Sequence, residues 1–322
     1  MDAQVPSAAI SSNSRNLHFS LHSSDKLLFV FWGSLSIVSL VLHSRIQLWW
    51  AIVATDFAAV VLICALAYAS QITASKVLRW THDWAAFPLV IFTYKQLYYI
   101  IRPIHGGKDF DQLLIAVDRF LFRVNPTEWL ARFANPYLTE VLQIAYSLFY
   151  VLFLAVGFEL YRRQDPSQFR FARFTMVYGF LLSYIGYFFL PAAGPRFTLH
   201  DFSKIDTELP GLAFTNSLRW FVNIWESIHP GASNTVALAS AQRDVFPSGH
   251  TMMALVTIAL AYRYRLKMRG YVLAVGLLLI IATVYLRYHY VVDIVAGAFL
   301  ALACMLTVNR VYALLKSDYS RD

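Results

Sequence analysis

Two short segments of the chain place histidines where acid–base or nucleophilic chemistry is possible. The first, Pro247-Ser248-Gly249-His250, runs directly into an apolar stretch. Proline and serine often begin a helix, and the free N–H groups of its first turn, helped by the helix dipole, bind anions. We therefore expect Ser248 and the amide of Gly249 to face an anion to which His250 donates a proton. A capped helix start with an interfacial histidine is the alternative without chemistry.

The second segment, YLRYHYVVD, covers residues 285–293 and contains Arg287, His289 and Asp293. His289 and Asp293 are four residues apart and share one face if the segment is helical. A carboxylate at that spacing can hold one imidazole nitrogen and make the other a better nucleophile. Ionisable residues that border apolar spans are costly and usually functional, although a structural ion pair or an interfacial anchor also fits this spacing.

Three further basic residues are candidates for binding a phosphate. Arg196 follows Pro191-Ala192-Ala193-Gly194-Pro195, and its planar guanidinium suits phosphate oxygens. A helix exit with a snorkelling arginine is the alternative. Lys95 and Arg102, which precede Pro103, are weaker candidates, because interfacial anchoring explains them at least as well.

The elements that must position these residues are apolar helices. The chain is 58% hydrophobic and 14% charged, whereas soluble domains have about a quarter charged residues. Its apolar residues form blocks of about the length that crosses a bilayer. We expect an all-α, polytopic membrane helix bundle with about eight spans near 27–43, 50–70, 84–101, 139–160, 173–191, 248–264, 270–288 and 290–313.

The spans divide the chain into three parts and set its orientation. A disordered cytoplasmic tail (1–26) precedes two extra N-terminal spans (27–83) and a core (84–315) of six helices. The net charge of +8 comes largely from short loops, which favours a membrane protein over a nucleic-acid-binding one. The basic loops 162–173 and 263–269 are expected to be cytoplasmic, as are both termini.

That orientation places the loops 102–138 and 192–247 outside the cytoplasm. It also brings His250 and His289 to the same outer face, because one span leads inward from His250 and the next returns. Asn125-Pro126-Thr127-Glu128 predicts the start of a short amphipathic interfacial helix. A second interfacial segment is indicated by three aromatic residues, Trp220, Phe221 and Trp225.

The PSGH sequence and the later His-x-x-x-Asp together resemble the type-2 phosphatidic-acid phosphatase superfamily, over roughly spans three to eight. The resemblance implies that His289 is a nucleophile that becomes a phosphohistidine and that Asp293 orients it. It also implies that His250 protonates the leaving alcohol, while Ser248 and the Gly249 amide hold phosphate oxygens.

The chain departs from that family in its other motifs. The usual third motif, Ser-Arg-x5-His-x3-Asp, has Ala282 and Thr283 at its leading positions, so we expect Arg287 to supply the guanidinium from the adjacent turn. The usual first motif, Lys-x6-Arg-Pro, matches Lys95 to Pro103 literally but lies too early in the chain. Arg196 occupies the expected place and is the favoured phosphate ligand.

The combination of GPR, RDVFPSGHT and YLRYHYVVD looks like the branch that includes fungal inositol-phosphorylceramide synthases and related bacterial proteins. Sphingomyelin synthases share a comparable His-His-Asp arrangement. These resemblances imply transfer of a phospho-head group to an alcohol. Hydrolysis by water remains an equal alternative, because the same phosphohistidine can be resolved either way.

The expected activity is therefore that of a multi-pass membrane lipid phosphatase or phosphotransferase with an extracytoplasmic site. Its partners would be a lipid phosphate, a water or alcohol acceptor and membrane lipids. No metal or cofactor is expected, since no His-x-x-x-His pair or Glu-rich cluster occurs on any span. A transporter, which would carry charges deeper in its spans, and a non-catalytic binding or scaffold protein are the alternatives.

Overall fold

The computed structural model describes residues 20–163, 165–229 and 231–316, and every regular element among them is a helix. The body of the bundle consists of α1 (Ser23–Val41), α2 (Trp49–Ile72), α3 (Lys76–Ile104), α6 (Pro136–Ser147), α7 (Phe149–Arg162), α8 (Pro166–Tyr187), α13 (Gly249–Arg263), α14 (Arg269–Tyr285) and α15 (Val291–Leu315). The predicted all-α class is confirmed.

Each of the eight predicted spans falls on a helix of this body. The fourth is interrupted, since α6 and α7 meet at an angle of 49° beside Leu148. By length and apolar composition, α1, α2 and α15 can each cross a membrane, and the bent α6–α7 pair is a fourth. α3 and α8 are long, but they carry charged side chains such as Arg79 and Arg173. The helices indicate a membrane protein, and the count of eight crossings stays a prediction.

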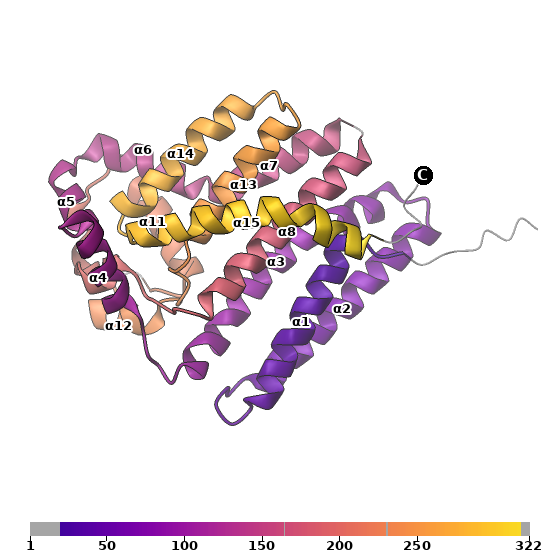
Figure 1. The fold of residues 1–322 in the computed structure, drawn as a ribbon, viewed down its shortest axis with the longest axis horizontal. Helices are drawn as coiled ribbons and strands as arrows, with labels where there is room; N and C mark the ends of the chain where they lie inside the picture. The colour runs from indigo at the N-terminus through magenta and orange to yellow at the C-terminus, as the bar shows by residue number, and fades with distance from the viewer. Residues whose placement is uncertain (1–19, 164, 230, 317–322) are drawn as a thin grey trace, which may run out of the picture.

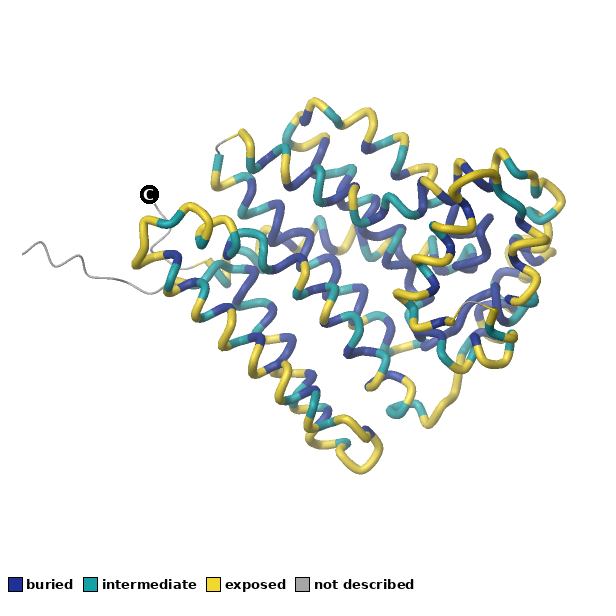
Figure 2. Tube along the Cα trace, turned by 180° about the vertical axis from the view of Figure 1, so that it is seen from behind, coloured by how far each residue is buried: buried dark blue, intermediate teal, exposed yellow. Residues whose placement is uncertain are grey.

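Helix α13 lies at the centre of the bundle. It packs against α14 and α15 on one side and against α7 and α8 on the other. α1 and α2 lie side by side at one flank and join the bundle through α3 and α8 (Figure 1). Buried positions line the inward faces of these helices, while exposed positions follow their outer faces (Figure 2).

The outer faces of several helices are apolar, which suits contact with lipid. On α2, the Phe57 side chain is 69% exposed, and on α15 the Leu306 side chain is also 69% exposed. Exposed apolar surface of this extent marks membrane or partner contact in proteins. The disordered tail was expected over residues 1–26. Residues 1–19 lie outside the described part of the chain, and residues 23–26 belong to α1.

The two long inter-span segments contain shorter helices. These are α4 (Asp111–Phe122), α5 (Pro126–Leu130), the 3-10 turn η1 (Ala131–Phe133), α9 (Pro195–Thr198), η2 (Phe202–Lys204), α10 (Ile205–Glu208), α11 (Thr215–Trp225) and α12 (Asn234–Ser240). Most of them gather at the end of the bundle where α6 begins and α14 ends (Figure 1). They form the surroundings of the two histidines.

The predicted helix start at Asn125 is confirmed, but the helix is short. α5 begins at Pro126 and continues only as far as η1. The Asn125 side chain does not cap it, since it accepts a hydrogen bond from Arg119 and donates one to Glu128. In the second loop, α11 presents the three predicted aromatic residues at its surface, Trp220, Phe221 and Trp225.

Candidate active site

His250 lies in the first turn of α13, where the local sequence sets a helix start. Ser248 is the N-cap, and its Oγ accepts a hydrogen bond of 3.2 Å from the Thr251 amide. The Ser248 amide donates to the backbone carbonyl of Asp293 over 2.9 Å, which ties this loop to α15. A Cβ at Gly249 would lie 2.3 Å from the Tyr187 hydroxyl, so a residue without a side chain is needed there.

His289 lies in the tight loop between α14 and α15. The loop turns back on α14, because the amides of Tyr288 and His289 both donate to the Thr283 carbonyl. Arg287 takes a left-handed conformation in this turn, with φ of 67°. The result is that His289 points away from the helix axis toward the start of α13.

The two histidines meet, as the order of spans predicted. Nε2 of His289 lies 3.4 Å from Nδ1 of His250, and the ring planes are inclined by 64°. Nδ1 of His289 lies 2.9 Å from the Val245 carbonyl oxygen. A carbonyl can only accept, so Nδ1 carries the proton and the lone pair stands on Nε2. Nε2 therefore accepts the hydrogen bond from Nδ1 of His250, and it is the nitrogen whose lone pair could attack.

Asp293 lies beside this pair and also caps α15. Its Oδ2 accepts a hydrogen bond of 2.8 Å from the Tyr290 amide and is 3.5 Å from Nδ1 of His289. Its Oδ1 is buried and has no hydrogen-bond partner among the described residues. The hydrogen bond from Nδ1 of His289 therefore goes to the Val245 carbonyl and not to Asp293. The sequence did not indicate this partner, because every residue has a backbone carbonyl.

An aromatic column supports His250 and links it to Arg196. The His250 ring stacks on Tyr146 with a centroid separation of 4.8 Å, and Tyr146 stacks on Tyr288 at 4.2 Å. The Arg196 guanidinium lies over the opposite end of the column, 4.6 Å from the Tyr288 ring centroid. Phe149 closes the remaining side of His250 at 4.4 Å. The imidazole is thus held in one orientation by packing.

Arg196 is buried close to the histidines, with 5% of its surface exposed. Its amide donates to the Arg287 carbonyl over 3.0 Å, which joins its loop to the His289 loop. The guanidinium forms an ion pair with Glu226 at the end of α11 and lies 3.4 Å from Oδ1 of Asn223. The guanidinium that the sequence suggested for phosphate binding therefore carries a carboxylate partner in this structure.

The other predicted basic residues lie in different settings. The Arg287 guanidinium is buried and pairs with Glu208 of α10, and its Nε has no hydrogen-bond partner among the described residues. The Lys95 ammonium stands 5.8 Å from the centroid of the Trp225 ring. Arg102 is exposed and donates to the Ala239 carbonyl over 3.0 Å. Lys95 thus contacts Trp225, which lines the cavity beside His250.

That cavity has a volume of about 90 Å³ and opens beside His250 and Gly249. Its walls are mainly aromatic, and they include two carboxylates, Glu226 and Asp244. Asp244 is half-buried, and its Oδ2 accepts a hydrogen bond of 2.8 Å from the Tyr94 hydroxyl. The sequence did not mark either acid as a site residue, although Asp244 lies within the RDVFPSGHT segment.

Two acids of α4, also missed, clamp the loops that carry the site. Asp111 accepts hydrogen bonds from the amides of Ala193 and Gly194 at 3.0 and 2.8 Å, and from the Tyr290 hydroxyl at 2.8 Å. Asp118 accepts from the first two amides of α15, both at 2.9 Å. The two acids are seven residues apart, about two helical turns, and therefore share one face of α4. This spacing was the only sign in the sequence that they could act together.

Electrostatics keep His289 in its neutral form. Burial is the main cause that lowers the pKa of His289 to about 4, and the nearby charge of Arg196 acts in the same direction. The Asp244 carboxylate and the hydrogen bond to Val245 oppose this shift. At neutral pH the imidazole is therefore uncharged, which is the form that can act as a nucleophile.

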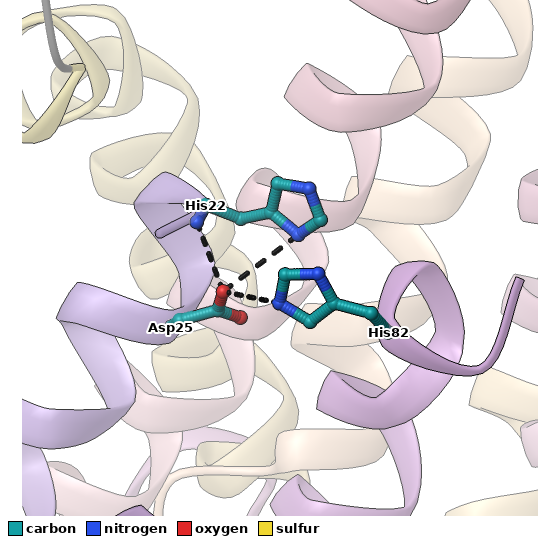
Figure 3. A group of neighbouring side chains, drawn as sticks. All are labelled: His22, Asp25 and His82. Atoms are coloured by element: carbon teal, nitrogen blue, oxygen red, sulfur yellow. Dashed lines mark hydrogen bonds and ion pairs between the residues drawn. The ribbon is translucent and has the colours of Figure 1, made fainter. Parts of the chain in front are cut away.

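A second cluster of ionisable groups, His22, Asp25 and His82, joins α1 to α3 (Figure 3). Oδ2 of Asp25 lies 2.9 Å from Nε2 of His82 and 3.7 Å from Nδ1 of His22. The two rings are stacked at 4.1 Å with planes inclined by only 13°. A metal ion lies near the plane of each imidazole that binds it, and stacked rings share no such point. The arrangement suits a link between helices.

Comparison with known proteins gives two matches. A sequence model described as the PAP2 superfamily matches residues 112–307, which include every candidate site residue except Lys95 and Arg102. Over 217 residues the chain is 26% identical to a PA-phosphatase related-family protein of Dictyostelium discoideum. That alignment covers 61% of this chain and 35% of the relative, so the chain spans about a third of the relative's length. No solved structure matches.

Proposed function

The chain belongs to the PAP2 superfamily, and from this premise we propose that it cleaves a lipid phosphate ester through a phosphohistidine on His289. The observation that carries the proposal is the geometry of the histidine pair. Nδ1 of His289 is fixed by Val245, and its free Nε2 stands 3.4 Å from His250. A phosphoryl group bound beside this pair would have a nucleophile and a proton donor within reach, once the contact between the two nitrogens opens.

In the first step, the lone pair on Nε2 of His289 attacks phosphorus in line with the leaving oxygen. A nitrogen–phosphorus bond forms as the bond from phosphorus to the leaving oxygen breaks. His250 gives its proton to that oxygen, which departs as an alcohol. The negative charge of the bound substrate stabilises the protonated imidazole of His250 that this step requires.

In the second step, water or an alcohol takes the place of the departed group. His250, now neutral, removes the proton from the entering hydroxyl, whose oxygen bonds to phosphorus while the nitrogen–phosphorus bond breaks. His289 returns to its neutral form and His250 to its protonated form. Water gives a phosphatase, and an alcohol gives a phosphotransferase.

The surrounding residues supply the stabilisation of charge. Arg196, whose guanidinium lies over the Tyr288 end of the aromatic column, is the first candidate for the equatorial oxygens. The N-terminus of α13, with the amide of Gly249, is the second. Arg287 acts through its backbone carbonyl, which holds the Arg196 amide, and its guanidinium joins the phosphate site only if Glu208 releases it. Asp293 keeps the His289 loop at the start of α15.

A lipid substrate is supported by the position of the site among apolar surfaces. α11, which carries Glu226 into the site, exposes Trp220 and Phe221 at its surface. Aromatic side chains of this kind favour the membrane interface. We place this face outside the cytoplasm, so that acyl chains stay in lipid while the phosphate reaches the histidines. The name of the Dictyostelium relative, a PA-phosphatase related-family protein, agrees with such a substrate.

A product assay tests the proposal. Purified protein in lipid vesicles is given phospholipids labelled at phosphorus, with and without an added alcohol acceptor. We expect wild-type protein to release free phosphate or to form a new phosphodiester, and His289→Asn to lose at least about 10³-fold of that rate. His43→Asn, the same change at an exposed histidine, should keep full activity. Equal rates in wild-type and His289→Asn protein would favour a non-catalytic binding protein or a transporter.

A further inference from the structure

The end of α4 and the helical turns that follow it expose an apolar surface on the outside of the molecule. α4 and α5 lie at the edge of the bundle, remote from α1 and α2 (Figure 1). Phe120 is 72% exposed and Phe133 is 51% exposed. The large apolar residues exposed in this stretch are Phe120, Leu121, Phe122, Val124, Trp129 and Phe133. A run of such side chains at a surface marks contact with a membrane or a partner.

Basic side chains stand among these apolar residues. The exposed arginines of residues 119–133 are Arg119, Arg123 and Arg132, and the stretch contains one acid, Glu128. The Arg123 guanidinium lies 5.9 Å from the centroid of the Phe120 ring. Arg119 donates a hydrogen bond of 2.7 Å to Asn125, which ties the end of α4 to the start of α5. The surface thus combines aromatic rings with an excess of positive charge.

A surface of anionic phospholipid fits this combination. Aromatic side chains favour the boundary between acyl chains and head groups, and arginines beside them meet lipid phosphates. The apolar surface also continues along the chain into α6, the first half of the bent candidate span, where Tyr137 is 73% and Val141 50% exposed. A second copy of the chain, docked here about a two-fold axis, would instead bring the arginines of both copies together.

The opposite face of α4 holds the loops of the candidate active site. Asp111 accepts a hydrogen bond from the loop before Arg196, and Asp118 accepts one from the start of α15. Both acids are buried, whereas Leu113 and Phe120 on the outer face are exposed. Contact with lipid on the outer face therefore restrains the helix whose inner face carries these hydrogen bonds.

We propose that residues 119–133 dock on anionic phospholipids, and that this contact supports turnover by restraining α4. Arg123 and Arg132 contact lipid phosphates, while Phe120, Trp129 and Phe133 enter the layer of head groups and upper acyl chains. The docking is independent of the proposed function, and the effect on turnover rests on it. In the proposed orientation this surface faces the outer leaflet.

Competition between two lipids tests the docking. Purified protein in detergent is mixed with equal amounts of phosphatidylglycerol and phosphatidylcholine that carry identical acyl chains, and the lipid retained after gel filtration is quantified. We expect wild-type protein to prefer phosphatidylglycerol by at least about fivefold, and Arg123→Gln/Arg132→Gln protein to lose most of that preference. Arg45→Gln/Lys108→Gln, which removes two exposed charges after α1 and α3 on the same side, is the matched control and should keep it.

Turnover in vesicles tests the coupling through α4. The phosphate-labelled substrate of the product assay is given to protein in vesicles of phosphatidylcholine, alone or mixed with phosphatidylglycerol. Addition of phosphatidylglycerol should raise the wild-type rate by at least about fivefold, an ordinary coupling between two sites. The Arg123→Gln/Arg132→Gln protein should respond little, and the control variant should respond like wild type.

The outcomes are separable. Equal retention of the two lipids by wild-type protein, or an equal loss of preference in the control variant, overturns the docking. Phe133→Cys protein without Cys64 and Cys304 that forms disulfide-linked dimers in vesicles would assign the surface to a second copy and also overturn it. A wild-type rate that ignores phosphatidylglycerol overturns the coupling alone. Absence of turnover from every sample refutes the proposed function and with it the coupling, while lipid retention still decides the docking.

Discussion

The chemistry at His289 depends on atoms that belong to other residues. The Val245 carbonyl accepts a hydrogen bond from the Nδ1 N–H, and this leaves the lone pair on Nε2. Tyr146 and Phe149 hold the His250 ring in place, so the two imidazoles face each other at 3.4 Å. In the proposed mechanism, hydrogen bonding and packing set the division of roles at this scale, with His289 as the nucleophile and His250 as the acid.

The acid role of His250 predicts a dependence on the leaving group. With an ordinary lipid ester, His250→Asn should lower kcat by about 10²–10⁴-fold, because the departing alkoxide is no longer protonated. With a nitrophenyl ester of the same phosphate, which leaves without a proton, the loss should be at least tenfold smaller. Steady-state rates on the two substrates measure this. A similar loss on both would show that His250 acts in some other way.

The buried position of His289 predicts an unusual pH profile. Because burial lowers its pKa to about 4, the imidazole stays neutral from pH 7 down to about 5 and is protonated only below that. For a phosphodiester lipid, whose own charge is constant over this range, protonation of His289 should therefore not lower kcat/KM until the pH approaches about 4. An acid limb centred near 6.5, the ordinary value for histidine, would contradict the assignment.

At the scale of elements, α4 holds together the two loops on which the site depends. Asp111 fixes the loop before Arg196 and also binds the Tyr290 hydroxyl, while Asp118 caps the start of α15. The Arg196 amide then bonds to the Arg287 carbonyl, so the loops are joined to each other as well. A change in α4 should therefore reach the chemistry without touching the substrate.

Removal of the Asp111 carboxylate tests this link. Asp111→Ala leaves two buried amides and a hydroxyl without their acceptor, which should cost about 2–4 kcal/mol of stability. Activity should also fall, since Arg196 lies only two residues after Gly194. Thermal unfolding in detergent and phosphate-ester cleavage measure the two effects. Asp165→Ala, which removes the N-cap of α8, is the control and should cost about 1 kcal/mol with activity retained.

The sequence predicted the helices and the meeting of the histidines, because apolar blocks and their order suffice for both. It also located Arg196 and the helix start at Ser248. It did not predict Glu226, Asp244 or the α4 clamp, since these come from long loops without periodic hydropathy and act only through tertiary contacts. The segment from Lys95 to Pro103 matches the family's first motif literally, although its place in the chain differs from the family's. The Lys95 ammonium lies over Trp225, which lines the cavity wall.

At the scale of the whole molecule, the two basic loops come together at the end of the bundle remote from the histidines. Arg163 donates to the Tyr264 carbonyl over 2.8 Å and also to the Arg265 carbonyl. If positive loops stay in the cytoplasm, this end faces inward, and the histidines with α11 face outward. The proposed orientation thus rests on the contact of Arg163 with the 263–269 loop and on the tendency of basic loops to stay in the cytoplasm.

Labelling of single cysteines tests the orientation. In protein with Cys64 and Cys304 replaced, Ser203→Cys near the histidines should react with an impermeant maleimide in intact cells. Ser167→Cys at the start of α8 should react only after permeabilisation. Both serines are exposed, so accessibility within the fold does not bias the result. The reverse pattern would place the active site in the cytoplasm.

The central claim, a phosphohistidine on His289, can be observed directly. Wild-type protein is mixed with lipid labelled at phosphorus with ³²P, quenched in alkali within milliseconds, and digested for peptide mapping. We predict label on the peptide that contains His289, stable in alkali and lost in acid, and absent from His289→Asn protein. Turnover of the lipid with no label on His289 at any time, or label on His250 instead, would contradict the mechanism.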